Sequence, residues 1–194
     1  MLNGKRNGTY VEIGAQDAIL INNTYLLESH FQWKGVSIDI DENSRSSFKT
    51  RGRKNSFVVN DALRVDYERL FRENGFGNHI DYLQLDIDPQ SQTLACLKKL
   101  PLDRYRFSVI TYETDFYDPS INVKESKRNR DESRAILLSH GYELVGGNIA
   151  ILNRSDPFED WYIDPQVIDK KIAALFPSST EYNNKAESYI LTQR

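Results

Sequence analysis

The sequence predicts an α/β protein built on a mostly parallel β-sheet that carries helices on both faces. Short apolar runs alternate with amphipathic segments of about ten residues, and this alternation is typical of βαβ crossover units. The length of 194 residues suits a single domain with a two- or three-layer core. No internal repeat or low-complexity segment divides the chain, so nothing in the sequence indicates a domain boundary.

The first half of the chain contains three predicted strands. Residues 9–14 form a strand-like run that ends in glycine, and residues 24–31 follow with apolar side chains at helical spacing. Asn22, Asn23 or Thr24 is a suitable N-cap for this helix. The alternation then continues with a strand at 35–40, a short helix at 44–50 and a strand at 56–59.

The second half repeats this pattern as far as the C-terminal tail. A helix with Tyr67, Leu70 and Phe71 on one face ends before Gly75 and Gly77. Further elements are expected as a strand at 80–85, a helix at 93–100, a strand at 107–112, a helix at 131–140, and a hairpin or one interrupted strand over 142–145 and 149–152. Beyond Asp164, a last helix with Ile168, Ile172, Leu175 and Phe176 on one side is expected to pack against the sheet.

Composition limits the classes of protein and partner. Hydrophobic residues make up 39% of the chain and charged residues 27%, as in soluble globular proteins. The formal net charge of -3 argues against nucleic acid as the main partner, and no apolar run reaches the roughly 20 residues of a membrane span. No leader peptide is apparent, and the single cysteine, Cys96, suits packing in a core. We therefore expect a cytoplasmic protein that binds neither nucleic acid nor membrane, and the sequence does not indicate its oligomeric state.

Acidic residues follow nearly every predicted strand. In parallel sheets the ligand lies at the carboxyl ends of the strands, where buried carboxylates need a partner. Ribose hydroxyls, an adenine amino group and a sulfonium cation are suitable partners for carboxylates. The residues concerned are Glu12 and Asp17, Asp39 and Asp41, Asp61, Asp86 and Asp88, and Glu113 and Asp115.

The turn after the first strand points away from a dinucleotide. It contains Gly14 but lacks the full G-x-G-x-x-G phosphate motif, which a cofactor without a pyrophosphate does not need. Asp39 follows Gly14 by 25 residues, near the spacing at which an acid at the end of the second strand binds ribose. Asp39 also suits a helix cap, whereas Gly14 is expected to let the backbone approach the cofactor closely.

Several short motifs occur in order from about Gly8 to Trp161. They are Gly8-x-Tyr10-Val-Glu-Ile-Gly-Ala15-x-Asp17, Asn23-Thr24, Leu27-Glu28, Trp33-Lys-Gly35-Val, Asp81-Tyr-Leu-Gln-Leu-Asp86-Ile-Asp88, and the stretch from Tyr105 to Tyr117. In these motifs the chain resembles the FkbM-type methyltransferases, a family within the class I S-adenosylmethionine-dependent fold.

The resemblance implies a Rossmann-like fold with seven strands in the order 3-2-1-4-5-7-6. The methyltransferase domain would span residues 1–194, with a core at about 8–165 and a C-terminal helix and tail at 166–194. S-Adenosylmethionine would be the cofactor, with methionine at Glu12 to Gly14, ribose at Asp39 and adenine near Asp61. The expected cofactor-binding residues are Glu12, Gly14, Ala15, Asp17, Asn23, Thr24, Asp39, Asp61 and Ala62.

The methyl acceptor is expected beside the ends of the fourth and fifth strands. The family favours a hydroxyl of a sugar, glycan or small metabolite, although a nitrogen or carbon acceptor stays open. The expected catalytic residues are Asp86, Asp88, Glu113 and Asp115. Either one of these acids is a general base, or Asp86 and Asp88 hold Mg²⁺ or Ca²⁺ that orients substrate hydroxyls. Solvated acids that cap the following turns are the simpler alternative.

Two other classes of function also fit parts of the sequence. Asp86-Ile-Asp88 matches the Asp-x-Asp triplet with which metal-dependent nucleotide-sugar glycosyltransferases hold a diphosphate. Such an enzyme should carry more basic residues near the strand ends. A non-catalytic binding domain on the same fold would instead use Phe116, Tyr117, Trp161 and Tyr162 as an exposed interaction surface.

Overall fold

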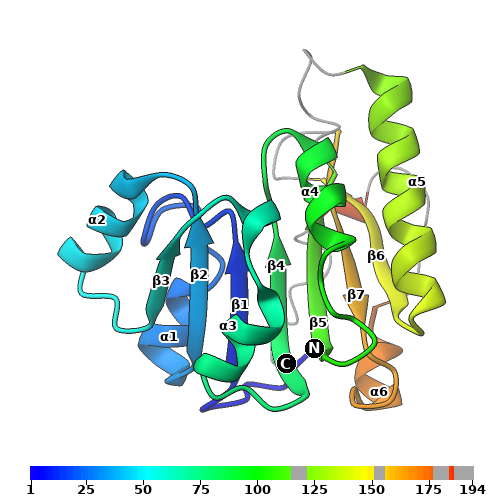
Figure 1. Ribbon diagram of the computed structural model, residues 1–194. Coiled ribbons are helices and arrows are strands. Elements are labelled where there is room, and N and C mark those ends of the chain that lie inside the picture. Colours follow the sequence, from blue (N-terminus) through cyan, green and yellow to red (C-terminus); the bar gives the residue numbers. More distant parts are fainter. Residues whose placement is uncertain (115–121, 151–155, 177–183, 186–194) are drawn as a thin grey trace.

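The protein is described from a computed structural model, which covers residues 1–114, 122–150, 156–176 and 184–185 (Figure 1). The described residues contain a single eight-stranded sheet. Its strands are β1 Thr9–Ile13, β2 Lys34–Asp39, β3 Ser56–Val59, β4 His79–Leu85, β5 Arg106–Glu113, β6 Glu143–Ala150, β7 Pro157–Ile163 and β8 Asn184–Lys185.

The strand order is β3-β2-β1-β4-β5-β7-β6-β8. Strands β1 to β5 pair in parallel, whereas β7 runs antiparallel to both β5 and β6. The predicted order 3-2-1-4-5-7-6 is therefore confirmed, and the two-residue β8 adds a strand beside β6. The chain moves outward from β1 to β3 and returns to β4 on the other side of β1, so the strand order reverses between β1 and β4.

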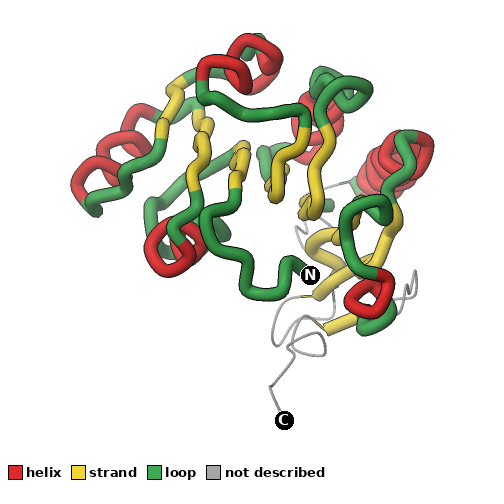
Figure 2. The backbone as a smooth tube through the Cα atoms, turned by 90° about the horizontal axis from the view of Figure 1, so that it is seen from below, coloured by secondary structure: helices red, strands yellow, loops and turns green. Residues whose placement is uncertain are grey.

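The helices lie on both faces of this sheet, as Figure 2 shows along the strands. They are α1 Tyr25–Phe31, α2 Glu42–Thr50, α3 Tyr67–Glu73, α4 Gln90–Leu97, α5 Val123–Ser139, α6 Lys170–Ala173, and a 3-10 turn at Ala62–Arg64. Helices α3, α4 and α5 supply residues to the larger hydrophobic core on one face. Helices α1 and α6 and the N-terminal segment pack on the opposite face.

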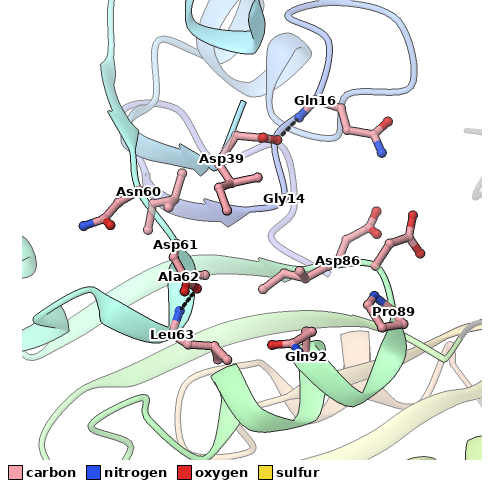
Figure 3. Close-up of a pocket in the computed structure, with 14 residues that line it drawn as sticks. Gly14, Gln16, Asp39, Asn60, Asp61, Ala62, Leu63, Asp86, Pro89 and Gln92 are labelled. Atoms are coloured by element: carbon pink, nitrogen blue, oxygen red, sulfur yellow. Dashed lines mark hydrogen bonds between the residues drawn. The ribbon is translucent and has the colours of Figure 1, made fainter. Parts of the chain in front are cut away.

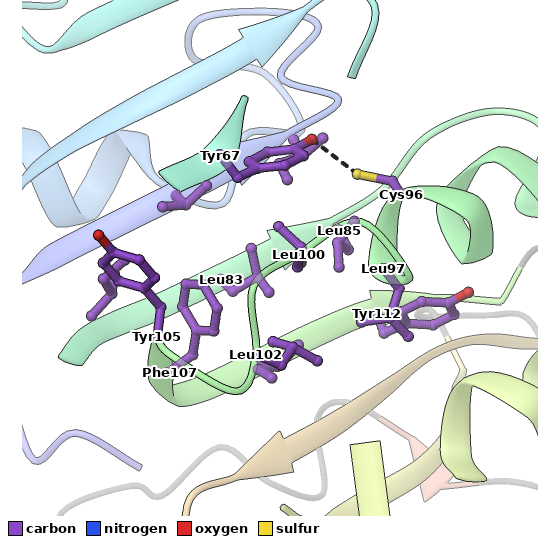
Figure 4. Packing of buried hydrophobic residues seen from close by; sticks show 14 of the residues in the cluster. Tyr67, Leu83, Leu85, Cys96, Leu97, Leu100, Leu102, Tyr105, Phe107 and Tyr112 are labelled. Atoms are coloured by element: carbon purple, nitrogen blue, oxygen red, sulfur yellow. Dashed lines mark hydrogen bonds between the residues drawn. The ribbon is translucent and has the colours of Figure 1, made fainter. Parts of the chain in front are cut away.

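The larger core joins the central strands to α3, α4 and α5 (Figure 4). Phe71 contacts Tyr105 edge-on with ring centroids 5.1 Å apart, and the Tyr67 hydroxyl lies 3.0 Å from the Cys96 sulfur. Burial raises the pKa of the Cys96 thiol to about 11. Cys96 is therefore a core residue, as the sequence predicts, because a buried neutral thiol behaves as a small hydrophobic group.

Side-chain caps fix where several helices begin. Asp41, Asp66 and Asn122 each accept a hydrogen bond from a backbone N–H in the first turn of the helix that follows, α2, α3 and α5 respectively. The cap at Asn122 starts α5 at Val123, well before the predicted start at Asp131. The charged run after Val123 hides the helix because it has little apolar periodicity.

The C-terminal part of the sheet differs from the prediction. Residues 143–150 form one strand, with register shifts around Gly146. Its hairpin partner is β7, a strand that was not predicted. The predicted last helix is only the four-residue α6, although Ile168 and Phe176 are buried as expected. The polar tail falls mostly outside the described residues. Within the described part of the chain, no helix has both the length and the apolar character that a membrane crossing requires.

Candidate functional site

A cleft of about 490 Å³ opens at the carboxyl ends of the central strands, where the strand order reverses between β1 and β4 (Figure 3). This is the position at which α/β sheets bind ligands. Its lining combines four carboxylates with aliphatic and amide side chains. The lining residues are Gly14, Gln16, Ile38, Asp39, Ile40, Asn60, Asp61, Ala62, Leu63, Asp86, Ile87, Asp88, Pro89 and Gln92.

Gly14 forms the floor of the cleft for a reason that differs from the expected one. Its φ is +86°, and a Cβ built on it would overlap the backbone carbonyl oxygen of Asp86. Its N–H donates to the carbonyl of Ile38 at 2.9 Å, so the turn lies between the ends of β2 and β4. Close packing of protein backbone therefore already requires glycine, before any cofactor is considered.

Asp39 is fixed at the end of β2 by two backbone groups. Its Oδ2 accepts from Gln16 N–H and its Oδ1 from Asp41 N–H, both at 2.8 Å. The side chain that caps α2 is Asp41 and not Asp39. Because each carboxylate oxygen can accept a further hydrogen bond, the fixed Asp39 side chain can accept hydrogen bonds from a pair of ligand hydroxyls.

The far wall of the cleft follows β3. Asp61 accepts a hydrogen bond from Leu63 N–H at 2.9 Å and caps the 3-10 turn, while Ala62 and Leu63 give the wall an apolar surface. Ile40, directly after β2, completes this surface and is 73% exposed. An apolar wall beside Asp61 suits a flat aromatic ring with polar edges.

The remaining predicted cofactor residues do not line the cleft. Glu12, Ala15 and Thr24 are buried, and Asp17 accepts hydrogen bonds from the backbone N–H groups of Ile19 and Leu20. These residues support the turn that carries Gly14. Asn23 lies on the α1 side of the sheet, beside a separate cavity of about 370 Å³ next to the N-terminal segment.

Arg53 holds the loop between Gly14 and α1. Its guanidinium pairs with Glu28 at 2.6 Å and donates to Ala18 O, Asn22 Oδ1 and Thr24 Oγ1 at 2.7 to 3.1 Å. The Arg53 side chain is only 3% exposed. Arg53 does not stand out in the sequence, because it belongs to a basic cluster, Lys49 to Lys54, that resembles a solvated surface.

Glu12 is a fully buried carboxyl behind the floor of the cleft. Ser37 donates a hydrogen bond to its Oε2 at 2.6 Å. Burial raises the pKa of Glu12 to about 7, and the hydrogen bond from Ser37 and the charge of Arg53 offset part of this rise.

We expect Glu12→Gln to reduce the fall in stability with rising pH. The pKa of Glu12 is about 7 in the folded protein and near its ordinary value of 4.5 in the unfolded chain, so folding takes up a proton between these values. The free energy of unfolding should therefore fall as the pH rises from about 4.5 to 7. The amide stays neutral and should make the protein more stable at pH 8 by on the order of 2 to 3 kcal/mol.

Urea unfolding at pH 5 and pH 8 measures this effect. Glu143→Gln is the control, because Glu143 is exposed and its substitution should leave the pH dependence unchanged. Parallel pH profiles for the wild type and Glu12→Gln would contradict the assignment.

Two of the predicted catalytic acids line the cleft, and a third is buried and interacts with one of them. Asp86 and Asp88 line it after β4, Glu113 ends β5 and is 4% exposed, and Asp115 lies outside the described residues. Burial raises the pKa of Asp86 and the charge of Asp88 adds to this, whereas a hydrogen bond with Glu113 lowers it. A hydrogen bond between two carboxyls needs a shared proton, so this pair can take up or release a proton near the cleft.

Glu159 on β7 extends this group of acids, and it is not among the site residues predicted from the sequence. It pairs in register with Glu113, and Trp161 Nε1 donates to its Oε1. Burial raises the pKa of Glu159 to about 7, and the charges of Asp86 and Asp160 add to the rise. The sequence signal that could have identified this strand is the alternation of Glu159, Trp161 and Ile163, which lie on one face of β7.

The structure does not support the expected metal site. Among the described residues, no group of three or more His, Cys, Asp or Glu side chains is arranged to hold a metal ion. Asp86 and Asp88 remain a pair of cleft carboxylates. Trp161 and Tyr162, expected in an exposed interaction surface, lie in β7, where Tyr162 is fully buried.

The chain matches no protein-family model and no curated protein sequence. Its structure is similar to a candidate rRNA-methylase from Clostridium thermocellum, with a TM-score of 0.57 and 11% identity over 82% of this chain and 87% of that one. It is also similar to Aeropyrum pernix fibrillarin in complex with natively bound S-adenosyl-L-methionine, with a TM-score of 0.55 and 11% identity over 82% and 68% of the two chains. For a Methanococcus jannaschii fibrillarin pre-rRNA processing protein the TM-score is 0.52 and the identity 12%, over 84% and 69%.

These similarities establish the fold. The chain has the Rossmann-like class I methyltransferase fold, with the strand order and the antiparallel β7 described above. At 11 to 12% identity they do not extend to a substrate or to a particular family.

Proposed function

We propose that this protein is an S-adenosylmethionine-dependent methyltransferase. The observation that carries the proposal is the charge of the cleft. Four aspartates, Asp39, Asp61, Asp86 and Asp88, line it, and the described lining residues include no Lys, Arg or His. A ligand with a positive charge and several hydroxyl groups complements such a cleft, whereas a diphosphate is repelled by it.

The parts of the cleft suit the parts of S-adenosylmethionine. Asp39 would accept hydrogen bonds from the two ribose hydroxyls, and Ile40, Ala62 and Leu63 would offer an apolar surface to adenine. The sulfonium would then lie toward Asp86. The same charge argues against a nucleotide-sugar glycosyltransferase, which needs cations or a metal against its diphosphate.

For the acceptor we propose a hydroxyl of a sugar, glycan or small metabolite, as in FkbM-type enzymes. When bound, S-adenosylmethionine supplies a methyl group that is attached to a positively charged sulfur. The acceptor oxygen would take this methyl group, and the sulfur would keep the bonding electron pair and leave as a neutral thioether. The hydroxyl proton passes to the Asp86–Glu113 carboxyl pair, which serves as the general base.

A thermal-shift panel tests the cofactor. S-Adenosylmethionine and S-adenosylhomocysteine should each raise the melting temperature, because a ligand at 100 times its Kd stabilises by about 2.7 kcal/mol. Nucleotide sugars with Mn²⁺ should have no effect. A shift with nucleotide sugars alone would favour the glycosyltransferase, and no shift with any ligand would favour a binding domain.

Asp39→Ala should weaken binding of S-adenosylhomocysteine about a hundredfold. The loss of two charge-assisted hydrogen bonds corresponds to about 3 kcal/mol. Isothermal titration calorimetry measures the affinity. Asp66→Ala is the control, since Asp66 also accepts a backbone N–H at a helix start but lies outside the cleft. Equal affinity of Asp39→Ala and wild type would show that ribose binds elsewhere.

A further inference from the structure

A second, smaller pocket of about 230 Å³ lies between the first turns of α4 and α5. These two helices lie side by side in Figure 1. Pro89 lines both this pocket and the cofactor cleft, so the two spaces adjoin. The other lining residues are Gln90, Ser91, Asn122, Glu125, Ser126 and Asn129.

Two side chains in this pocket are buried without a hydrogen-bond partner. Gln90 is 2% exposed and Ser126 is 1% exposed. The amide nitrogen and oxygen of Gln90 and the hydroxyl of Ser126 all lack a hydrogen-bond partner among the described residues. A buried polar group left unpaired costs about 1 to 3 kcal/mol. Leucine and alanine would avoid this cost, so the polar side chains point to a ligand that pairs with them.

The chemistry of the lining restricts the class of ligand. The Gln90 amide and the Ser126 hydroxyl each both donate and accept hydrogen bonds. The described lining contains the carboxylate of Glu125 and no basic side chain, and Asp88 lines the adjoining cleft. These charges oppose an anion, although two helix N-termini are near. Ligand hydroxyls both donate and accept, and they match amide, hydroxyl and carboxylate groups together.

We propose that this pocket binds the ring of a sugar or a similar neutral polyol, which forms part of the methyl acceptor. Gln90 and Ser126 hold the ring hydroxyls, and the hydroxyl to be methylated reaches past Pro89 toward Asp86. The role of this ligand as acceptor rests on the proposed methyltransferase function. The binding of a polyol does not, so the two can be tested separately.

Saturation-transfer-difference NMR on the full chain tests the pocket. The probes are glucose, mannose, fucose, rhamnose and their methyl glycosides, with inorganic phosphate as a competing anion. At least one sugar should bind, and phosphate should not displace it. Gln90→Leu and Ser126→Ala should each weaken that binding at least tenfold. Both variants should unfold at urea concentrations no lower than the wild type, because each removes an unpaired polar group.

Gln166→Leu and Ser139→Ala are the matched controls, since both residues are exposed and neither lines the pocket. They should retain sugar binding. The proposal is overturned if no sugar binds, if Gln90→Leu and Ser126→Ala bind as the wild type does, or if phosphate binds in place of sugar. Sugar binding without any thermal shift by S-adenosylhomocysteine would refute the methyltransferase and keep the pocket. The reverse result would refute the pocket alone.

Discussion

Arg53→Met should lower the free energy of unfolding by about 3 to 5 kcal/mol, far more than substitution of an exposed basic residue would. The substitution removes the partner of Glu28, which is 11% exposed, and leaves a buried carboxylate uncompensated. It also removes the hydrogen bonds that the guanidinium donates to Ala18, Asn22 and Thr24. The loop between Gly14 and α1 should therefore loosen together with the fold.

Urea unfolding with two controls isolates this effect. Arg51→Met makes the same substitution at an exposed position in the same cluster, and its effect should stay within about 0.5 kcal/mol. The double variant Glu28→Gln/Arg53→Met removes the orphaned charge and should be more stable than Arg53→Met alone. Equal stability of Arg51→Met and Arg53→Met would contradict the buried-pair explanation.

Arg53 also illustrates why the sequence predicted some features and not others. The first five strands and the helices between them were predicted from local apolar patterns. The strand order was implied by a family resemblance, and the strand pairing confirms that order. The burial of Arg53 depends on residues 25 to 35 positions away in the chain. No local pattern distinguishes it from Arg51, because both stand among polar neighbours.

The C-terminal hairpin was the part of the fold that local patterns failed to predict. Strand β7 contains Glu159 and Asp160 within an antiparallel pairing, and charged residues are uncommon in a central strand. Asp160 is fully buried and receives two hydrogen bonds from Arg134 on α5, at 2.7 and 2.8 Å. The ion pair with Arg134 thus compensates the charge of Asp160, although a charged residue is locally unfavourable for strand prediction.

The sequence likewise predicted only part of the site correctly. Strand-end acids of β2, β3 and β4 do meet in one cleft, because parallel strands bring their carboxyl ends to one edge. Glu12 and Thr24 belong to the same motifs but are buried beneath the turn. A motif gives the order of residues along the chain, whereas the side of the sheet on which each residue lies depends on the strand register.

Gly14→Ala should have the largest effect at the site itself, since Gly14 links the ends of β1, β2 and β4. An added Cβ would overlap the backbone carbonyl oxygen of Asp86, and backbone cannot move aside as a flexible side chain can. The turn must shift, which separates Gly14 from Asp86 and from the carbonyl of Ile38. We expect destabilisation by at least about 2 kcal/mol beyond the cost of the left-handed conformation, and no measurable binding of S-adenosylhomocysteine.

Gly52→Ala is the control that separates the steric overlap of the added Cβ from the cost of a left-handed backbone conformation. Gly52 has φ +74°, close to the +86° of Gly14, but a Cβ there would meet nothing within 4 Å. It should therefore show only the conformational cost of about 1 to 2 kcal/mol and leave binding unchanged. Urea unfolding and calorimetry on both variants give the two quantities. If Gly14→Ala is no less stable than Gly52→Ala and still binds, the carbonyl of Asp86 has room to move. The close approach of β1 and β4 would then not be what requires glycine at this turn.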